Sequence, residues 1–157
     1  MKTVILFTIF MFVLDQFTKF LVDNFIAYNS YVNVVTWFNF LNITNIHNTG
    51  IAFSMFENKN LILSCVVFLV LIIIIVFLYK NVSKLSKIKK YAFYLILSGG
   101  FGNLSDRLLR GAVVDFIDFG INSLRWPSFN IADSCIFVAT ILFFIDIIFI
   151  DCKKNNN

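Results

Sequence analysis

The feature that most constrains this chain is a run of apolar residues at positions 61–79 that contains no charge. An α-helix rises about 1.5 Å per residue, so about 20 apolar residues cross the hydrocarbon core of a bilayer. Three further runs of similar length occupy residues 3–25, 91–109 and 131–150. Hydrophobic residues make up 59% of the 157 positions and charged residues 14%, which is too apolar for a soluble domain of this size. The sequence therefore predicts one membrane domain over residues 1–157, mainly α-helical, with four transmembrane helices.

The first apolar run has an alternative interpretation as a cleaved signal peptide, because Lys2 precedes it. No small-residue cleavage site follows the run, and Asp15 and Lys19 interrupt it where a signal peptide stays apolar. We therefore interpret residues 3–25 as a retained helix. Asp15, Lys19 and Asp23 are spaced four apart, so Lys19 can pair with either carboxylate along one helical face.

A second kind of segment lies between the first two runs. Residues 31–38 and 40–44 are rich in β-branched and aromatic residues and alternate in part between apolar and polar side chains. They predict a small β-rich segment at about residues 28–56 that lies on the outer membrane surface, where Trp37 suits the level of the lipid headgroups. His47 is interpreted as a loop residue, because no second histidine or nearby cysteine could complete a metal site with it.

The orientation of the spans follows from the positions of the basic residues. The loop at residues 80–90 carries five lysines, and the two termini carry Lys2, Lys153 and Lys154. The opposite side, which includes a predicted outer loop at residues 110–129, carries only Lys59, Arg110 and Arg125. Cytoplasmic loops are enriched in Lys and Arg, so both termini are predicted to be cytoplasmic. The net charge of +4 therefore reflects membrane topology and does not indicate nucleic-acid binding.

The third apolar run ends in a polar helical face. Asn103, Asp106, Arg107 and Arg110 stand at i, i+3, i+4 and i+7. An Asp or Arg at the centre of a membrane helix costs about 2.5–3.5 kcal/mol, whereas a Leu or Phe returns only about 0.3–0.6 kcal/mol. Such a face indicates a functional site. A structural Asp106–Arg107 pair that pins a helix bundle is the alternative.

Two further carboxylates lie near the outer ends of the third and fourth runs. Asp115 follows the third run, and Asp133 begins the fourth, three residues after Asn130. Antiparallel helices joined by a short loop can bring these two side chains together. Neighbouring carboxylates share a proton, which prepares one as a general base and the other as a general acid. The polar residues that can surround them are Asn48, Asn103, Asp106, Arg107 and Asn130.

Other hydrolytic sites are not supported by the sequence. It contains one histidine and no HExxH motif, so that zinc site is excluded. It has no GxSxG-like nucleophile elbow. The three cysteines have no CxxC spacing and no histidine–acid setting, so they predict neither a metal site nor a catalytic thiol. Paired aspartates are the hydrolytic chemistry that remains.

Four blocks, in order, resemble the lipoprotein signal peptidases (signal peptidase II) of bacteria over nearly the whole chain. They are residues 15–19 (DQFTK), 48–53 (NTGIAF), 99–107 (GGFGNLSDR) running on to 113–116 (VVDF), and 129–134 (FNIADS). The resemblance implies an intramembrane aspartic endopeptidase that removes signal peptides from prolipoproteins whose cysteine already carries diacylglycerol. Such an enzyme cuts just before the lipidated cysteine.

The resemblance also assigns roles to residues of this chain. It places the catalytic pair on Asp115 and Asp133. Supporting or substrate-binding positions would be Asn48, Asn103, Asp106, Arg107 and Asn130, with Asp15 and Lys19 in the first span. It implies a prolipoprotein substrate and no metal or organic cofactor. We also expect membrane lipids as partners, no nucleic acid, a monomer, and an active site on the outer side of the bacterial cytoplasmic membrane. Asp118 is an alternative acid, which we interpret as a loop residue.

A small transporter or channel component is the main alternative function, because intramembrane Asp, Lys and Arg also mark ion paths. Against it, residues 61–79 carry no charge, the polar groups gather at the outer ends, and the two halves of the chain do not resemble each other. A purely structural membrane protein is a further alternative, but it leaves Asp115 and Asp133 unexplained.

Overall fold

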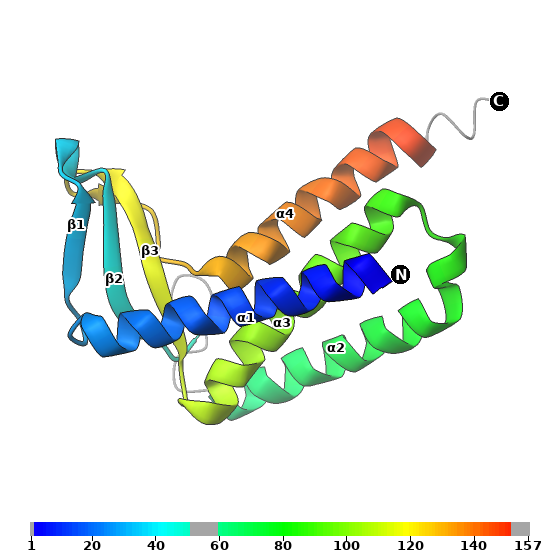
Figure 1. Ribbon diagram of the computed structural model, residues 1–157, viewed down its shortest axis with the longest axis horizontal. Coiled ribbons are helices and arrows are strands. Elements are labelled where there is room, and N and C mark those ends of the chain that lie inside the picture. The colour runs from blue at the N-terminus through cyan, green and yellow to red at the C-terminus, as the bar shows by residue number, and fades with distance from the viewer. Residues whose placement is uncertain (1, 51–59, 152–157) are drawn as a thin grey trace.

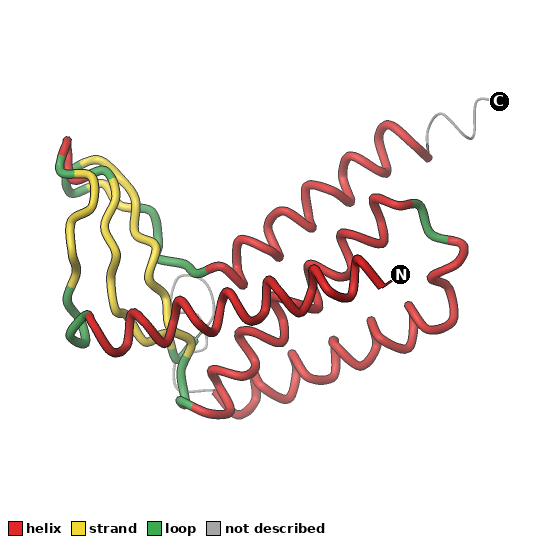
Figure 2. Tube along the Cα trace, viewed as in Figure 1, coloured by secondary structure: helices red, strands yellow, loops and turns green. Residues whose placement is uncertain are grey.

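The computed structural model describes residues 2–50 and 60–151. Within them, four helices run side by side and an antiparallel sheet covers one end of the bundle (Figures 1 and 2). The helices are α1 (Lys2–Phe25), α2 (Asn60–Asn81), α3 (Lys87–Leu109) and α4 (Ile131–Ile145). A π-helical turn, Asp146–Asp151, continues α4. The start of α1 and the end of α4 both lie at the end of the bundle away from the sheet.

Three segments are long and apolar enough to cross a membrane, as judged by length and composition over the described residues. They are Ile5–Phe25, Asn60–Lys84 and Ile131–Ile148. The predicted helix at residues 91–109 is present as α3, but α3 does not meet that criterion, since it contains lysines, Asp106 and Arg107. Helix α3 instead packs against the other three helices, which bury residues such as Leu95, Leu97 and Leu104. A helix enclosed by protein has less need of an apolar lipid-facing surface.

Helix α3 begins four residues earlier than predicted because its N-terminus is capped. The Ser86 hydroxyl accepts a hydrogen bond from Lys89 N and donates one to the buried Asp146. Lys89 Nζ lies 3.0 Å from Asp146 Oδ2. These contacts tie the start of α3 to the end of α4, at the end of the bundle away from the sheet.

Two glycines of α3 allow the helices to approach closely. A Cβ atom added at Gly99 would clash with the backbone oxygen of Ala132 on α4. A Cβ added at Gly102 would lie 2.7 Å from Asp15 Oδ2 and 3.0 Å from Ala132 Cβ. Small residues at a helix interface let backbones come together in this way. Gly99 and Gly102 therefore set how α1, α3 and α4 meet beneath the sheet.

The substitution Gly99→Ala is expected to destabilise the protein by about 1–3 kcal/mol, since an overpacked interface must shift its backbone. The clash outweighs the gain of about 1 kcal/mol in helix propensity from Gly to Ala. Thermal unfolding in detergent measures the difference. Ser105→Ala, at a half-buried position of the same helix, is the control and should unfold near the wild-type temperature. An unchanged midpoint for Gly99→Ala would contradict this packing.

The sheet contains strands β1 (Tyr31–Val35), β2 (Leu41–Asn48), β3 (Val113–Ile121) and β4 (Leu124–Arg125) in that order. Strands β1 and β2 fall in the predicted β-rich segment at residues 28–56. Residues 51–56 of that segment lie outside the described part of the chain. The interpretation of residues 110–129 as a loop was wrong. Strand β3 occupies its centre and pairs with β2, because its sequence VVDFIDFGI is rich in β-branched and aromatic residues.

Candidate active site

Asp115 lies on strand β3, and the residue is 4% exposed. Its two carboxylate oxygens accept hydrogen bonds from two asparagines: Asn48 Nδ2 at 3.0 Å and Asn130 Nδ2 at 2.8 Å. Asn48 is the last residue of β2, which pairs with β3, and Asn130 immediately precedes α4. Three elements that are distant in sequence therefore fix the position of this carboxylate.

Asp133 lies in the first turn of α4 and belongs to its cap. Asn130 Oδ1 accepts a hydrogen bond from Asp133 N at 2.9 Å, and Asp133 Oδ2 accepts one from Asn130 N at 3.3 Å. This reciprocal arrangement is a capping box. The other oxygen, Asp133 Oδ1, accepts a hydrogen bond from Asn103 Nδ2 on α3 at 2.7 Å. The helix N-terminus also favours a negative charge at Asp133.

Asn130 and Asn103 link the two carboxylates. Asn130 is fully buried, and its Nδ2 lies within hydrogen-bonding distance of Asp115 Oδ1, of Asn103 Oδ1 at 3.2 Å and of Val114 O at 3.3 Å. Asn103 holds Asp133, and Asn130 caps the turn that carries Asp133. Asn103 and Asn130 thus connect Asp115 and Asp133, hereafter the dyad.

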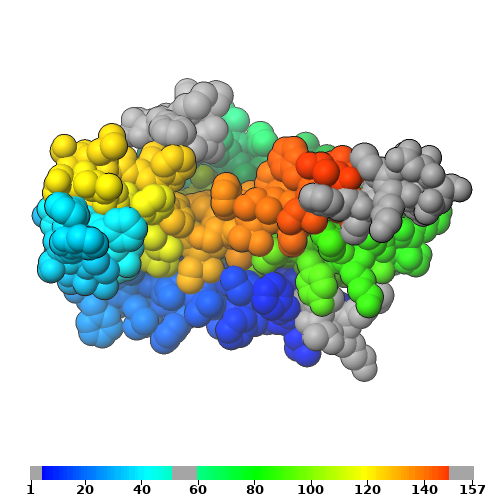
Figure 3. Space-filling model, turned by 90° about the horizontal axis from the view of Figure 1, so that it is seen from above, coloured from blue at the N-terminus to red at the C-terminus, as the bar shows by residue number. Residues whose placement is uncertain are grey.

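The dyad lines a groove with a volume of about 810 Å³. On the bundle side of the dyad the groove follows α2, α3 and α4 past Val67, Gly100, Ile136, Phe137 and Thr140. On the sheet side it passes Trp126, Pro127, Ser128 and Phe129. Figure 3 shows β3 and α4 adjoining on one surface of the molecule, with α1 along the lower edge. An elongated, largely apolar groove with two carboxylates suits an extended or helical peptide.

The surroundings of Asp115 favour its neutral form. Burial and, to a lesser extent, the negative charge of Asp133 raise the pKa of Asp115, whereas the hydrogen bonds from Asn48 and Asn130 and the charge of Lys19 lower it in part. The net result is a pKa of about 7. A carboxyl group that holds its proton near neutral pH can act as a general acid.

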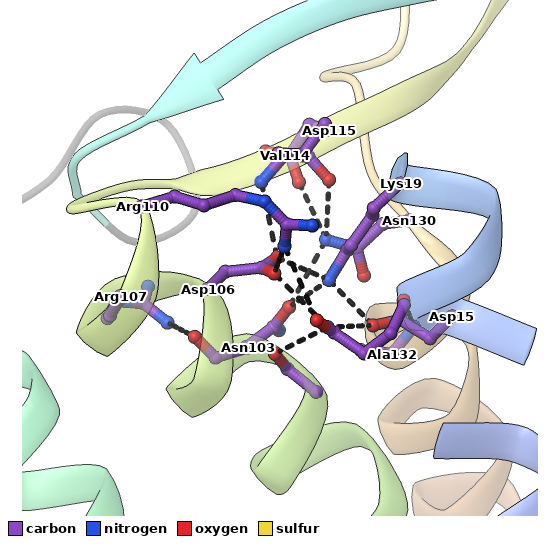
Figure 4. A network of polar contacts seen from close by, with 12 residues as sticks. Asp15, Lys19, Asn103, Asp106, Arg107, Arg110, Val114, Asp115, Asn130 and Ala132 are labelled. Carbon is purple, nitrogen blue, oxygen red and sulfur yellow. Dashed lines mark hydrogen bonds and ion pairs between the residues drawn. The ribbon is translucent and has the colours of Figure 1, made fainter. Parts of the chain in front are cut away.

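Behind the dyad lies a buried ionic cluster of Asp15, Lys19 and Asp106 (Figure 4). Lys19 Nζ is 2.8 Å from Asp15 Oδ2, 2.7 Å from Asp106 Oδ2 and 3.2 Å from Asn103 Oδ1. Asp15 Oδ1 also accepts a hydrogen bond from Ala132 N at 2.9 Å. Of the two carboxylates predicted as partners of Lys19, the structure pairs it with Asp15. Lys19 connects this cluster to the dyad through Asn103.

Asp106 does not pair with Arg107, its neighbour in sequence. Besides Lys19, its partner is Arg110, whose Nη1 contacts Asp106 Oδ1. Gln16 Nε2 donates to the same oxygen at 3.1 Å, and its Oε1 accepts from Arg110 Nη1 at 3.3 Å. The Asp106–Arg107 alternative is therefore not what the structure contains. Sequence reasoning missed Gln16, and the i, i+4 spacing of Asp106 and Arg110 was the available signal for the second pair.

Arg107 points to the groove side of α3 and is 8% exposed. Its Nη2 donates to Gly50 O at 2.8 Å and its Nη1 to Asn103 O at 3.4 Å, while Asn60 Nδ2 donates to Arg107 O at 3.1 Å. Its Nε has no hydrogen-bond partner among the described residues. No carboxylate in the described part of the chain forms an ion pair with it. Arg107 therefore carries a buried positive charge next to the dyad, and its Nε–H can still donate a hydrogen bond.

Asp118 and His47 are not loop residues. Asp118 lies in β3, where Arg125 binds its carboxylate at 2.8 and 3.0 Å and Asn42 Nδ2 donates to it at 2.9 Å. These contacts occupy Asp118, and it does not line the groove. His47 lies in β2, and its Nε2 is 3.0 Å from Asp23 Oδ1. No group of three or more His, Cys, Asp or Glu side chains in the described residues could hold a metal ion.

Comparison with known proteins agrees with this architecture. A family model described as signal peptidase (SPase) II matches residues 7–149. A lipoprotein signal peptidase of Borrelia hermsii is 43% identical over 94% of this chain and 92% of its own length. One of Alteromonas mediterranea is 39% identical over 86% of this chain and 74% of its own.

Two solved structures, both described as bacterial membrane enzymes, are each 32% identical to this chain. One superimposes with a TM-score of 0.84 over 94% of this chain and 88% of its own. The other gives 0.81 over 96% and 95%. Likeness in sequence and in fold each extends over most of the chain. This multi-pass membrane protein therefore belongs to the signal peptidase II family.

Proposed function

We propose that this protein removes signal peptides from prolipoproteins whose cysteine carries diacylglycerol, and that it cuts just before that cysteine. The observation that carries the proposal is the dyad: two carboxylates held by shared asparagines and lining one groove. The relatives are named lipoprotein signal peptidases, which supports a prolipoprotein as substrate. The groove walls on α2, α3 and α4 would accept the apolar signal helix, and the scissile bond would lie at the dyad.

The dyad can perform hydrolysis as an acid–base pair. Asp133, at the helix N-terminus, acts as the base and takes a proton from water while the water oxygen attacks the carbonyl carbon. Asp115 donates its proton to the carbonyl oxygen, which forms a gem-diol. Asp115 then recovers a proton from the gem-diol as the C–N bond breaks. Asp133 gives its proton to the amine of the lipidated cysteine, so both carboxyl groups return to their initial states.

Arg107 and the two asparagines have different tasks in this proposal. The side-chain amides of Asn103 and Asn130 are engaged with the dyad and position it. Arg107 lines the groove, and its Nε has no partner within the described part of the chain. Its positive charge would stabilise the negative charge that develops on the carbonyl oxygen during attack.

The membrane arrangement is also part of the proposal. Helix α3 would be the fourth span, enclosed by the other three, with both termini cytoplasmic and the sheet at the outer surface of the bacterial cytoplasmic membrane. Residues 24–46 carry no charged side chain, and Trp37, in the 3-10 turn between β1 and β2, is 75% exposed. An uncharged aromatic edge of this kind suits the lipid headgroup region.

The pH dependence of cleavage tests this assignment. The proton on Asp115 is present below its pKa of about 7 and is lost as the pH rises through that value. We expect the turnover rate to fall above about pH 7, approaching about tenfold per pH unit well above it. The measurement is cleavage of a diacylglyceryl-modified prolipoprotein in detergent from pH 5 to 9, with unfolding followed at each pH. A flat rate from pH 7 to 9 would contradict the role of Asp115 as the acid.

A further inference from the structure

The polar network behind the dyad continues to the surface through Arg110. Arg110 follows the last residue of α3, and its side chain turns toward α1. Its Nη1 contacts Asp106 Oδ1, and its Nε is 3.3 Å from Asp23 Oδ2. The other oxygen of Asp23 is 3.0 Å from Nε2 of His47 on β2. The end of α3 and the end of α1 therefore meet at one guanidinium, and Asp23 links it to strand β2.

Asp106 connects Arg110 to both members of the dyad. Asp106 Oδ2 lies 2.7 Å from Lys19 Nζ, and Lys19 reaches Asp133 through Asn103. The same oxygen accepts a hydrogen bond from Val114 N at 3.4 Å, and Val114 directly precedes Asp115. Displacement of the Asp106 carboxylate would therefore disturb the support of Asp133 and the strand that carries Asp115.

The charges of the buried cluster balance only when Arg110 is included. Asp15 and Asp106 bring two negative charges to the buried cluster, and Lys19 brings one positive charge. Arg110 supplies the second positive charge and shares it with Asp23. The charged groups that act on Asp115 itself are Asp133, Lys19 and Arg107. Arg110 thus reaches the dyad only through other side chains.

We propose that Arg110 is a positioning residue for the dyad, and that Asp23 and His47 hold it in place from the surface. The inference rests on the proposed function of the dyad and adds residues that the sequence-based site lacks. It assigns to Arg110 the task of keeping Asp106 against Lys19 and Val114. The side chain is 25% exposed and contacts neither groove nor dyad, so its effect should appear in turnover and leave substrate binding unchanged.

The test compares Arg110→Met and Arg110→Lys with wild type in cleavage of a diacylglyceryl-modified prolipoprotein. Arg110→Met is expected to lower kcat about tenfold and leave KM within about twofold, because the dyad is displaced while the groove is intact. Without Arg110, Asp106 draws more strongly on Lys19. The positive charge of Lys19 then lowers the pKa of Asp115 less, so the alkaline fall of the rate moves to higher pH. Arg110→Lys keeps the charge and should restore most of kcat and the wild-type pH profile.

The variant Asp23→Asn provides a second test of the proposal, which remains informative if Arg110→Met does not fold. Removing this negative charge leaves Arg110 more fully to Asp106, so Lys19 acts more strongly on Asp115. We expect a smaller loss of kcat and a shift of the pH profile in the opposite direction, to lower pH. A role limited to packing would not produce opposite shifts. Both shifts should shrink at high salt, since Arg110 and Asp23 are partly exposed.

The control is Lys90→Met, which removes one positive charge from the other end of α3 and should match wild type. The inference is overturned if Arg110→Met is folded and keeps the kcat and pH profile of wild type. It is also overturned if Arg110→Lys is as impaired as Arg110→Met, or if Asp23→Asn shifts the profile in the same direction. If wild type itself does not cleave the lipidated substrate, the proposed function fails first, and that outcome is distinct from these.

Discussion

Asp115→Asn and Asp133→Asn are each expected to abolish cleavage, with a loss of kcat of at least about 10³-fold. Asparagine nearly preserves the size of the side chain and can keep part of the hydrogen bonding to Asn48, Asn103 and Asn130. It cannot hold or release the catalytic proton, so the acid–base pair is lost while the groove remains. The measurement is turnover of a diacylglyceryl-modified prolipoprotein by purified protein in detergent.

Asp118→Asn is the matched control for this experiment. Asp118 lies on the same strand, three residues from Asp115, but Arg125 and Asn42 occupy its carboxylate. This variant should retain activity within about threefold of wild type, with some loss of stability from the broken ion pair. If Asp118→Asn is inactive and Asp115→Asn remains active, both proteins being folded, the dyad has been misassigned.

Lys19→Met is expected to have the largest effect on stability, with a loss of about 3–5 kcal/mol, because it leaves buried carboxylates without their cation. Lys19 is fully buried and contacts Asp15 and Asp106 at 2.8 and 2.7 Å. Methionine has a similar volume, so packing alone does not explain such a loss. The yield of folded protein and the thermal unfolding midpoint in detergent report it.

The double variant Asp15→Asn/Lys19→Met separates charge from packing. It removes one carboxylate together with the cation and leaves Asp106 to Arg110, so part of the lost stability should return. Lys87→Met, at an exposed position at the start of α3, should unfold like wild type. Unfolding of Lys19→Met at the wild-type temperature would show that the buried cluster is not needed for the fold.

The helices were predictable because the bilayer imposes a length on apolar segments. The predicted range 61–79 and the observed helix Asn60–Asn81 nearly coincide. Helix α3 was predicted as well, yet it is not among the membrane-capable segments, because it contains lysines, Asp106 and Arg107. Where a helix faces other helices, composition alone does not report its position. Strand β3 was missed because Asp115 and Asp118 interrupt its apolar pattern, although its β-branched and aromatic residues were a usable signal.

The site was predictable only to the extent that it depends on local spacing and on the family resemblance. Asn130 and Asp133 are three residues apart, which is the spacing of a capping box, and the structure contains this capping box. The contacts of Gln16 with Asp106 and of Asp23 with His47 join residues that are far apart in sequence. Such contacts follow from tertiary packing and have no periodic signal. That is why Gln16 and His47 were absent from the predicted site.

The most direct test of the proposed function is intact-mass analysis of the products that wild-type protein releases from a diacylglyceryl-modified prolipoprotein in detergent. We expect two products, a signal peptide and a chain that begins with the lipidated cysteine, and neither product with Asp115→Asn or Asp133→Asn. A cut at another bond, or the same products from a dyad variant, would contradict it. Failure of folded wild-type protein to cut at all would also contradict the proposed function. That result would favour the alternative, a small transporter or channel component.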